Sequence, residues 1–265
     1  MKTKDVIICG TTGKLGQFLL RKLLNDNYRV VGLNKSKNKL KDNNYFEYIC
    51  DFRNLKKLKI IINKIKKKFK NIKLFINTVA IEGNSINFPI YTISSWKETF
   101  DVNFFSNVIL INSLLKNFNK KKLSVILFSG GGATIYPEGI MKKLDEYSCS
   151  KIALIKYTEI LGSKIYLKNI VNFNILAPGL LPGNIIKNII NKFNKYISPK
   201  EYKLFNKLKE PYLFDDDYEK IYRCIKFLEK EKKISGKIIS TTHDIISLKN
   251  QALYKKNKYT LRRLV

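Results

Sequence analysis

The chain has few of the residues that mark disulfide-stabilised or metal-binding proteins. Its 265 residues include four cysteines and one histidine. The cysteines form no C-x-x-C pair, so neither a disulfide framework nor a zinc site is expected, and the pattern is typical of a reducing compartment. We therefore expect a cytoplasmic protein without a metal centre.

Long hydrophobic runs are also lacking. One of the longer stretches without a charged residue, 102–115, is interrupted by Asn and Ser. A membrane-spanning helix needs about 18 or more apolar residues. The first apolar run, Val6–Cys9, is too short for the core of a signal peptide. The sequence therefore predicts no membrane span and no secretion signal.

Acidic residues are scarce relative to basic ones. The chain has 21 Asp and Glu against 51 Lys and Arg, which gives a net charge of +30. Only six of the basic residues are Arg, the residue that base-reading and bidentate phosphate sites favour. Dispersed Lys with abundant Ile and Asn is typical of an AT-rich genome, so we expect no specific nucleic-acid partner. Non-specific nucleic-acid binding and attraction of anionic substrates remain as alternatives.

Strand-like and helix-like segments alternate along the whole chain. Strands are expected at 5–9, 28–33, 45–50, 73–76, 124–128 and 170–176, and helices at 17–25, 55–69, 92–118 and 147–163. No repeat, linker or low-complexity segment breaks this alternation. The pattern predicts an α/β fold over 1–265 as one domain, with a doubly wound, mostly parallel, seven-stranded sheet and helices on both faces.

A glycine-rich segment separates the first expected strand from the first expected helix. Its spacing is Gly10-x-x-Gly13-x-x-Gly16. Glycines in this place let backbone N–H groups approach a pyrophosphate, which the positive end of the helix also attracts. The second strand is followed by Asn34, Lys35 and other residues without a carboxylate until Asp42. An acid there would bind the ribose of NAD, so the sequence favours NADP, with NAD as the alternative.

Tyr147 and Lys151 lie four residues apart, so a helix would place them on one face. An ammonium near a phenol favours the phenolate and lowers the pKa of the tyrosine. Tyr147 is therefore a candidate proton donor and acceptor. A solvated helix face is the alternative explanation of the same spacing.

Several further segments occur in a characteristic order. They are Asp51, Asn77-Thr78-Val79-Ala80, Asn103, Ser129, Tyr147-x-x-x-Lys151 and Asn174-x-x-x-Pro178-Gly179, all after the glycine turn. In order and spacing this set resembles the short-chain dehydrogenase/reductase family, over most of the chain. The resemblance implies a Rossmann fold and an oxidoreductase that transfers a hydride between NAD(P) and a carbonyl or alcohol substrate.

The resemblance also implies catalytic roles. Tyr147 would exchange the proton with the substrate oxygen. Lys151 would lower the pKa of Tyr147 and hold the nicotinamide ribose, and Asn103 would position a water in the proton relay. The family's catalytic serine has no clear counterpart, because counting back from Tyr147 gives Thr134 whereas counting from the strand end gives Gly130, beside Ser129. Ser129 and Thr134 are both candidates, and a purely structural Ser129 is the alternative.

The cofactor-binding residues that the resemblance implies lie in the glycine turn and at the ends of the strands. They are Gly10, Thr12, Gly13, Lys14, Leu15, Gly16, Asn34, Lys35, Asp51, Phe52, Asn77, Val79, Ala80, Lys151, Pro178 and Gly179.

The C-terminal third is expected to set substrate choice. In this family the region corresponding to 180–211 is a substrate lid, and 241–265 forms a C-terminal tail. The segments 235–240, Asp244 and 259–263, together with 129–134, resemble a branch linked to bacterial surface-polysaccharide synthesis. Phosphates of a nucleotide-sugar substrate could then meet Arg262 and Arg263. The resemblance further implies a homodimer or homotetramer. A non-catalytic NAD(P)-binding regulator of the same fold is the main alternative function, and a nucleic-acid-binding protein is a third.

Overall fold

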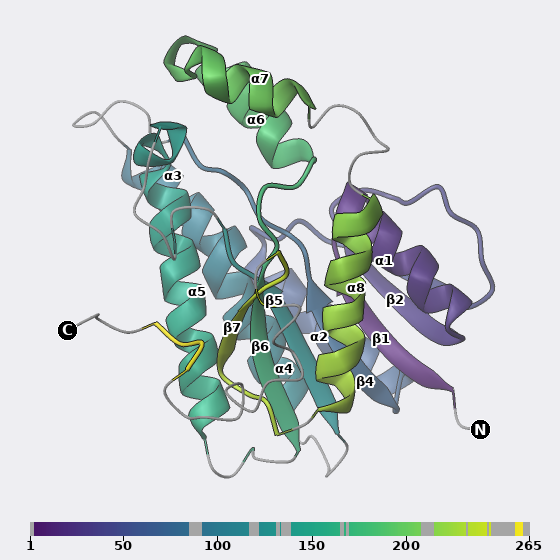
Figure 1. The fold of residues 1–265 in the computed structure, drawn as a ribbon. Coiled ribbons are helices and arrows are strands. Elements are labelled where there is room, and N and C mark those ends of the chain that lie inside the picture. The colour runs from purple at the N-terminus through teal and green to yellow at the C-terminus, as the bar shows by residue number, and fades with distance from the viewer. Residues whose placement is uncertain are drawn as a thin grey trace.

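Seven parallel strands form one sheet in the order β3-β2-β1-β4-β5-β6-β7 (Figure 1). The computed structural model describes residues 3–84, 92–116, 122–130, 133, 139–164, 167, 170–207, 215–231, 233–242, 244 and 258–261. The strands are β1 (Lys4–Cys9), β2 (Tyr28–Asn34), β3 (Tyr45–Ile49), β4 (Ile72–Asn77), β5 (Leu123–Phe128), β6 (Val171–Ala177) and β7 (Lys237–Ser240). The strand order reverses between β1 and β4, which is where doubly wound sheets bind ligands. The predicted fold class is confirmed.

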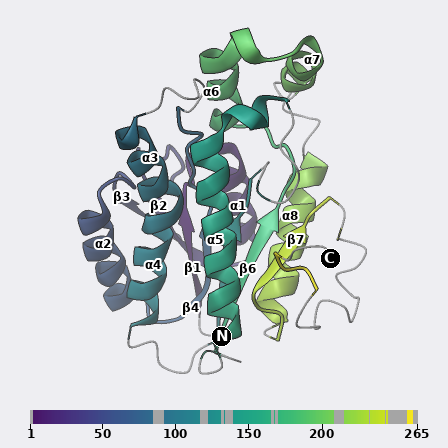
Figure 2. The same cartoon turned by 90° about the vertical axis from the view of Figure 1, so that its left-hand side faces the viewer.

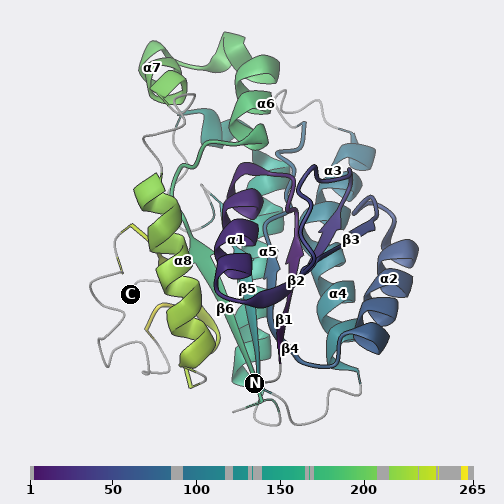
Figure 3. The ribbon, with the colours of Figure 1, turned by 90° about the vertical axis from the view of Figure 1, so that its right-hand side faces the viewer.

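Helices cover both faces of the sheet. On one face lie α2 (Leu55–Lys68), α4 (Ser106–Leu115) and α5 (Asp145–Ser163), which Figure 2 brings to the front. On the other face lie α1 (Lys14–Asn25) and α8 (Asp215–Lys230), which are seen in Figure 3. Because both faces are covered, the central strands are apolar on both sides.

Strand β1 illustrates how one segment serves both cores. Ile7 and Cys9 contact the core beneath α2, α4 and α5, whereas Val6 and Ile8 contact the core beneath α1 and α8. All four side chains are fully buried. Side chains alternate along a strand, so this continuous apolar run fits a central parallel strand.

The helix expected over 92–118 is interrupted. The structure has α3 (Ile93–Phe100), a π-helical turn η1 (Asp101–Phe105) and then α4. The turn contains Asn103, whose side chain is fully buried. Such turns are rare and occur often at functional sites.

Two further helices lie beyond the carboxyl ends of the strands. They are α6 (Asn184–Phe193) and α7 (Pro199–Lys207), with the short 3-10 helix η4 (Asn194–Tyr196) between them (Figure 1). A 3-10 helix η2 (Gly139–Lys143) precedes α5. Within the described residues, no helix is both long and apolar enough to cross a membrane.

The sequence analysis missed α8. Its buried residues Tyr218, Ile221, Ile225 and Leu228 recur at steps of three and four. That period is the signal that would have identified an amphipathic helix.

Candidate active site

The turn between β1 and α1 leaves no room for side chains. Gly10 has a positive φ of 89°, and a Cβ there would lie 2.6 Å from Thr78 Oγ1. A Cβ on Gly16 would lie 2.0 Å from the carbonyl oxygen of Gly10. Gly10 is required by its left-handed backbone conformation, and Gly16 is required because the atom that a Cβ would meet belongs to rigid backbone.

The first turn of α1 is suited to an anion. Gly13 is its N-cap and supplies no side-chain hydrogen bond, and the first turn contains no acidic residue. Its N–H groups therefore have no side-chain cap, and Lys14 adds an exposed cation. A dinucleotide pyrophosphate fits this cradle. Thr12 and Leu15, also predicted to bind the cofactor, lie partly exposed in the same turn.

Asn34 supports this turn from inside the protein. Its Oδ1 accepts from Thr11 N at 2.7 Å, and its Nδ2 donates to Thr11 Oγ1 and Glu47 Oε1, both at 2.7 Å. The side chain is fully buried. Asn34 therefore holds the turn in place, and the cofactor contact expected of it stays a prediction.

Glu47 is a residue that the sequence analysis missed at this end of the sheet. Its Oε1 also accepts from Asn38 N at 2.8 Å and from Tyr45 Oη at 3.1 Å. It comes from β3, opposite Gly32 of β2. Glu47 is 13 residues from Asn34 in sequence, so the residues directly after β2 give no sign of this carboxylate. Glu47 fixes the loop that carries Lys35.

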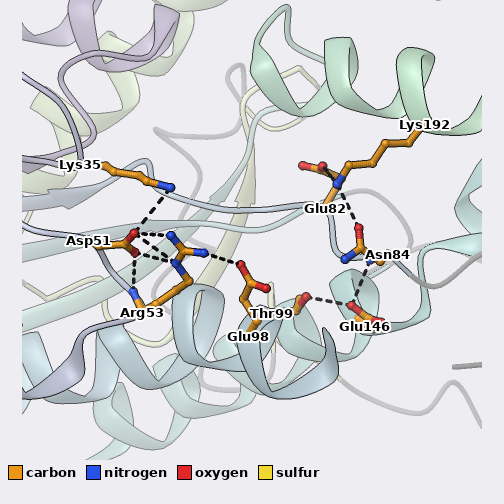
Figure 4. A network of polar contacts seen from close by, with 9 residues as sticks. All are labelled: Lys35, Asp51, Arg53, Glu82, Asn84, Glu98, Thr99, Glu146 and Lys192. Carbon is orange, nitrogen blue, oxygen red and sulfur yellow. Dashed lines mark hydrogen bonds and ion pairs between the residues drawn. The ribbon is translucent and has the colours of Figure 1, made fainter. Parts of the chain in front are cut away.

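Asp51 is held by a cluster of cations (Figure 4). It accepts from Arg53 Nε at 3.0 Å and Nη2 at 2.5 Å, and Lys35 Nζ lies 3.5 Å from Oδ2. Arg53 Nη1 also reaches Glu98 at 3.2 Å. The hydrogen bonds from Arg53 hold the pKa of Asp51 well below its usual range, although partial burial opposes this. Arg53 is a second residue that sequence reasoning missed.

Phe52 follows Asp51 but points elsewhere. Its side chain is 3% exposed and packs in the core beneath α2 and α4. Only its backbone can therefore contact a cofactor.

A chain of amides ties the end of β4 to the π-helical turn. Asn77 Oδ1 accepts from Val79 N at 2.9 Å, and its Nδ2 donates to Asn107 Oδ1 at 2.7 Å. Asn107 in turn donates to the carbonyl oxygen of Asn103 at 2.9 Å. This network sets the course of the segment that contains Val79 and Ala80.

Asn103 links three elements. Its amide makes two 2.9 Å hydrogen bonds with the backbone N–H and C=O of Ile81 and donates to Ser150 Oγ of α5 at 3.0 Å. The π-helical turn thus joins the segment after β4 to the helix that carries Tyr147. The water-positioning role expected of Asn103 stays a prediction.

Tyr147 and Lys151 lie one turn apart on α5, and both are buried. Lys151 Nζ donates to the carbonyl oxygen of Phe128 at 2.9 Å and lies 5.7 Å from the centre of the Tyr147 ring. Burial lowers the pKa of Lys151 to about 8. Burial, and secondarily the charge of Glu82, raise the pKa of Tyr147 to about 12. The expected lowering of the tyrosine pKa is not seen in this structure, because removal of the ring from water dominates.

The Tyr147 hydroxyl lies against the end of β5. A Cβ on Gly130 would come within 2.2 Å of Tyr147 Oη. Ser129 is 5% exposed, and its N–H continues the ladder to Leu176. A glycine is therefore required at position 130, which is where counting from the strand end placed the family's catalytic serine. Thr134 lies outside the described residues, as do Arg262 and Arg263.

Apolar side chains from three segments cover Tyr147. This cluster consists of Ile140, Leu144, Ile186, Ile189, Phe193 and Phe205, of which the last four belong to α6 and α7. Tyr147 is consequently only 8% exposed. Pro178 and Gly179 follow β6, and Gly179 has a positive φ of 75°.

The predicted residues thus gather at the carboxyl ends of the strands. The glycine turn follows β1, Asn77 ends β4, Ser129 follows β5 and Pro178 follows β6. Among the described residues, no group of three or more His, Cys, Asp or Glu side chains could hold a metal ion.

Comparison with known proteins identifies the family. The profile of the short chain dehydrogenase family matches residues 4–192. The chain belongs to the short-chain dehydrogenase/reductase family and is an oxidoreductase of that class.

Two proteins of Saccharomyces cerevisiae are similar in sequence. The uncharacterized oxidoreductase TDA5 is 23% identical over 187 residues, which cover 69% of this chain and 56% of TDA5. The uncharacterized oxidoreductase YIR035C is 24% identical over 216 residues, which cover 78% of this chain and 82% of YIR035C. The chain thus spans little more than half of the longer relative.

Solved structures share the fold. The crystal structure of the yeast protein YIR035C aligns with a TM-score of 0.77 and 21% identity, over 92% of this chain and 99% of that one. The structure of ElxO with NADP bound aligns with a TM-score of 0.73 and 18% identity, again over 92% and 99%.

Proposed function

We propose that this protein is an NADPH-dependent reductase or dehydrogenase of small carbonyl or alcohol compounds, with Tyr147 as the proton donor and acceptor. The observation that carries the proposal is the placement of Tyr147. It lies one helical turn from Lys151, with its hydroxyl at the end of β5, on the same strand edge as the glycine turn. A nicotinamide bound along this edge would supply or accept the hydride.

The protonation states of Tyr147 and Lys151 suit the reduction of a carbonyl group. Negative charge grows on a carbonyl oxygen as hydride reaches its carbon, and a positioned acid must neutralise it. With a pKa of about 12, Tyr147 carries its proton at neutral pH. Lys151 gives one of its three hydrogens to Phe128, so an ammonium there has donors left for a ribose hydroxyl.

Replacing Gly130 by alanine is expected to lower kcat by about 10²-fold, because the methyl group would push Tyr147 Oη out of place. NADPH affinity should stay within twofold. Gly183→Ala is the matched control, since no atom lies within 4 Å of a Cβ there. Equal kcat values for the two variants would show that the Tyr147 position in this structure is not the catalytic one.

NADPH is expected to bind more tightly than NADH. Lys35 and Lys37 are exposed beside the end of β2, Arg53 lies next to Lys35 at Asp51, and the nearby acid Glu47 is engaged by Asn34 and Asn38. These cations would attract a 2′-phosphate, as the NADP bound to ElxO also suggests for this fold.

Fluorescence titration of both cofactors tests this preference. Lys35→Met should weaken NADPH binding about tenfold and leave NADH binding nearly unchanged, because a charge-assisted hydrogen bond would be lost. A preference for NADH in the unmodified protein would overturn the NADP assignment.

A substrate screen tests the reaction class. The protein would be incubated with NADPH and a panel of ketones, aldehydes and keto-sugar nucleotides, and with NADP⁺ and the matching alcohols. Apolar groups cover Tyr147 from α6, so we expect turnover of carbonyls with an apolar substituent. The nucleotide-sugar assignment stays a prediction that this panel decides. Turnover of none of these compounds would contradict the proposal.

We also propose self-association through α4 and α5. Phe105, Ile152 and Ile160 are 44%, 38% and 49% exposed on this side of the molecule. Light scattering should give a dimer or tetramer, and Ile152→Lys should shift it toward monomer. A monomeric unmodified protein would contradict this part of the proposal.

All four cysteines are free, which supports the predicted cytoplasmic location.

A further inference from the structure

Glu82 is a buried carboxylate in the segment that follows β4. It is 3% exposed. Its Oε1 accepts from Lys192 Nζ at 2.6 Å, and its Oε2 accepts from Asn188 Nδ2 at 3.3 Å. Both partners belong to α6 and lie one turn apart, and Figure 4 shows Lys192 reaching from its helix to Glu82. A buried charge needs such partners.

The segment that carries Glu82 is fixed from two sides. On one side, Asn103 binds both backbone groups of Ile81. On the other, Glu146 Oε2 accepts from Asn84 N at 3.1 Å and from Thr99 Oγ1 at 2.9 Å (Figure 4). Glu146 directly precedes Tyr147 on α5. Glu82 is therefore held in a fixed position relative to the catalytic tyrosine.

The partner helix is the one that covers Tyr147. Ile186, Ile189 and Phe193 of α6 pack in the apolar cluster around the tyrosine ring. The side chain of Lys192 is 44% exposed, whereas that of Glu82 is 4% exposed. Lys192 thus approaches the buried Glu82 from the protein surface, and it would move away from Glu82 together with α6. A movement of α6 away from this cluster would uncover Tyr147, and it would also separate Lys192 from Glu82.

Glu82 and Lys192 also line a cavity of about 180 Å³ next to the site. Lys192 bridges this cavity by donating to Asn84 Oδ1 at 3.1 Å as well as to Glu82. The ion pair therefore closes the space between α6 and the segment after β4.

We propose that the Glu82–Lys192 ion pair is a latch that closes α6 over a substrate at Tyr147, and that Glu82 is thereby a positioning residue for turnover. This inference rests on the proposed role of Tyr147. Each closure would re-form the ion pair and the apolar cluster together, so a bound substrate would be shielded from water only while the latch is closed.

The latch also affects the proton on Tyr147. Among the described residues, the elements packed around the tyrosine carry the charged groups Lys151 on its own helix, Glu82 after β4, Lys192 on α6, Glu201 on α7 and Glu146 on α5. Glu201 is engaged by Ile140 N and Ser198, and Glu146 by Ser95 and Thr99. The charge of Glu82 raises the pKa of Tyr147. Removing Glu82 should therefore move the alkaline limb of the pH profile to lower pH, and removing Lys192 should move it to higher pH.

The test compares Lys192→Met with Lys187→Met, a matched control that removes an exposed lysine from the same helix. Hydrogen exchange of residues 184–193 is followed by mass spectrometry, together with KM, kcat and the pH profile. Lys192→Met should speed exchange in α6 and raise KM at least about tenfold, because a charge-assisted hydrogen bond to a buried carboxylate is lost. Lys187→Met should match the unmodified protein in all four measurements.

A charge swap separates the latch from its electrostatic effect. Glu82→Lys with Lys192→Glu should restore slow exchange and a low KM, while the alkaline limb moves below that of the unmodified protein. Equal exchange in Lys192→Met and Lys187→Met would overturn the latch, whether or not the protein turns over a substrate. Faster exchange in Lys192→Met than in Lys187→Met, in a protein that turns over none of the carbonyls and alcohols of the substrate panel, would leave the latch standing and refute the proposed function instead.

Discussion

Replacing Tyr147 by phenylalanine is expected to lower kcat by about 10²- to 10⁴-fold, because the proton donor is removed. The fold should be retained, since phenylalanine keeps the ring that packs against Ile186, Ile189 and Phe193. The hydroxyl contributes no described contact to the glycine turn, so NADPH affinity should stay nearly unchanged. Steady-state kinetics and cofactor titration measure the two effects separately.

Tyr157→Phe is the matched control for this variant. Tyr157 lies on the same helix, where its hydroxyl is 3.4 Å from Asn112 Oδ1, away from the strand ends. It should turn over substrate as the unmodified protein does. If Tyr147→Phe retained full kcat with an identified substrate, the role given to Tyr147 would be refuted.

Replacing Lys151 by methionine is expected to lower activity and cofactor binding while raising the free energy of unfolding. Cofactor binding and kcat should both fall at least about tenfold, because the ammonium that could reach the nicotinamide ribose is lost. Stability at pH 7 should nevertheless rise. The pKa of Lys151 falls from 10.5 to about 8 on burial, so the folded state holds this charge at a cost. That cost is about 3 kcal/mol, and the lost hydrogen bond to Phe128 offsets about 1 kcal/mol of the gain.

The pH dependence of this gain has a definite sign. Between pH 8 and 10.5 the unfolded chain binds more protons at Lys151 than the folded protein does. The contribution of Lys151 to the free energy of unfolding therefore becomes less unfavourable as pH rises across that window. The difference in stability between Lys151→Met and the unmodified protein shrinks accordingly. Urea unfolding of both proteins at pH 7 and pH 10 measures the difference. A lower stability of Lys151→Met at pH 7 would contradict the account of its burial.

Local patterns were enough to predict the fold and the frame of the site. Six of the seven strands were located from short apolar runs, all but β7, and the glycine turn was located from its spacing directly after β1. The placement of Tyr147 and Lys151 on one helix face follows from their spacing, whereas their catalytic role was inferred from the accompanying motifs and the family resemblance. Each of these features depends on residues that are close in sequence.

Features that depend on distant residues were not predicted. Asn34 was expected to bind the cofactor, and its hydrogen bonds to Thr11 in the turn after β1 and to Glu47 of β3 were not foreseen. The pKa of Tyr147 was expected to fall beside Lys151, whereas burial beneath α6 raises it to about 12. Glu82 has its charged partner 110 residues further along the chain. No local spacing signals such contacts, because tertiary packing alone creates them.

The most direct test of the central claim is a deuterium transfer experiment. The protein is given NADPH that carries deuterium at the transferable position of nicotinamide C4, together with a ketone that it consumes. Mass spectrometry of the product should find one deuterium on the carbinol carbon, formed at a rate that Tyr147→Phe lowers at least about 10²-fold. A product without deuterium, or equal rates in the two proteins, would contradict hydride transfer assisted by Tyr147.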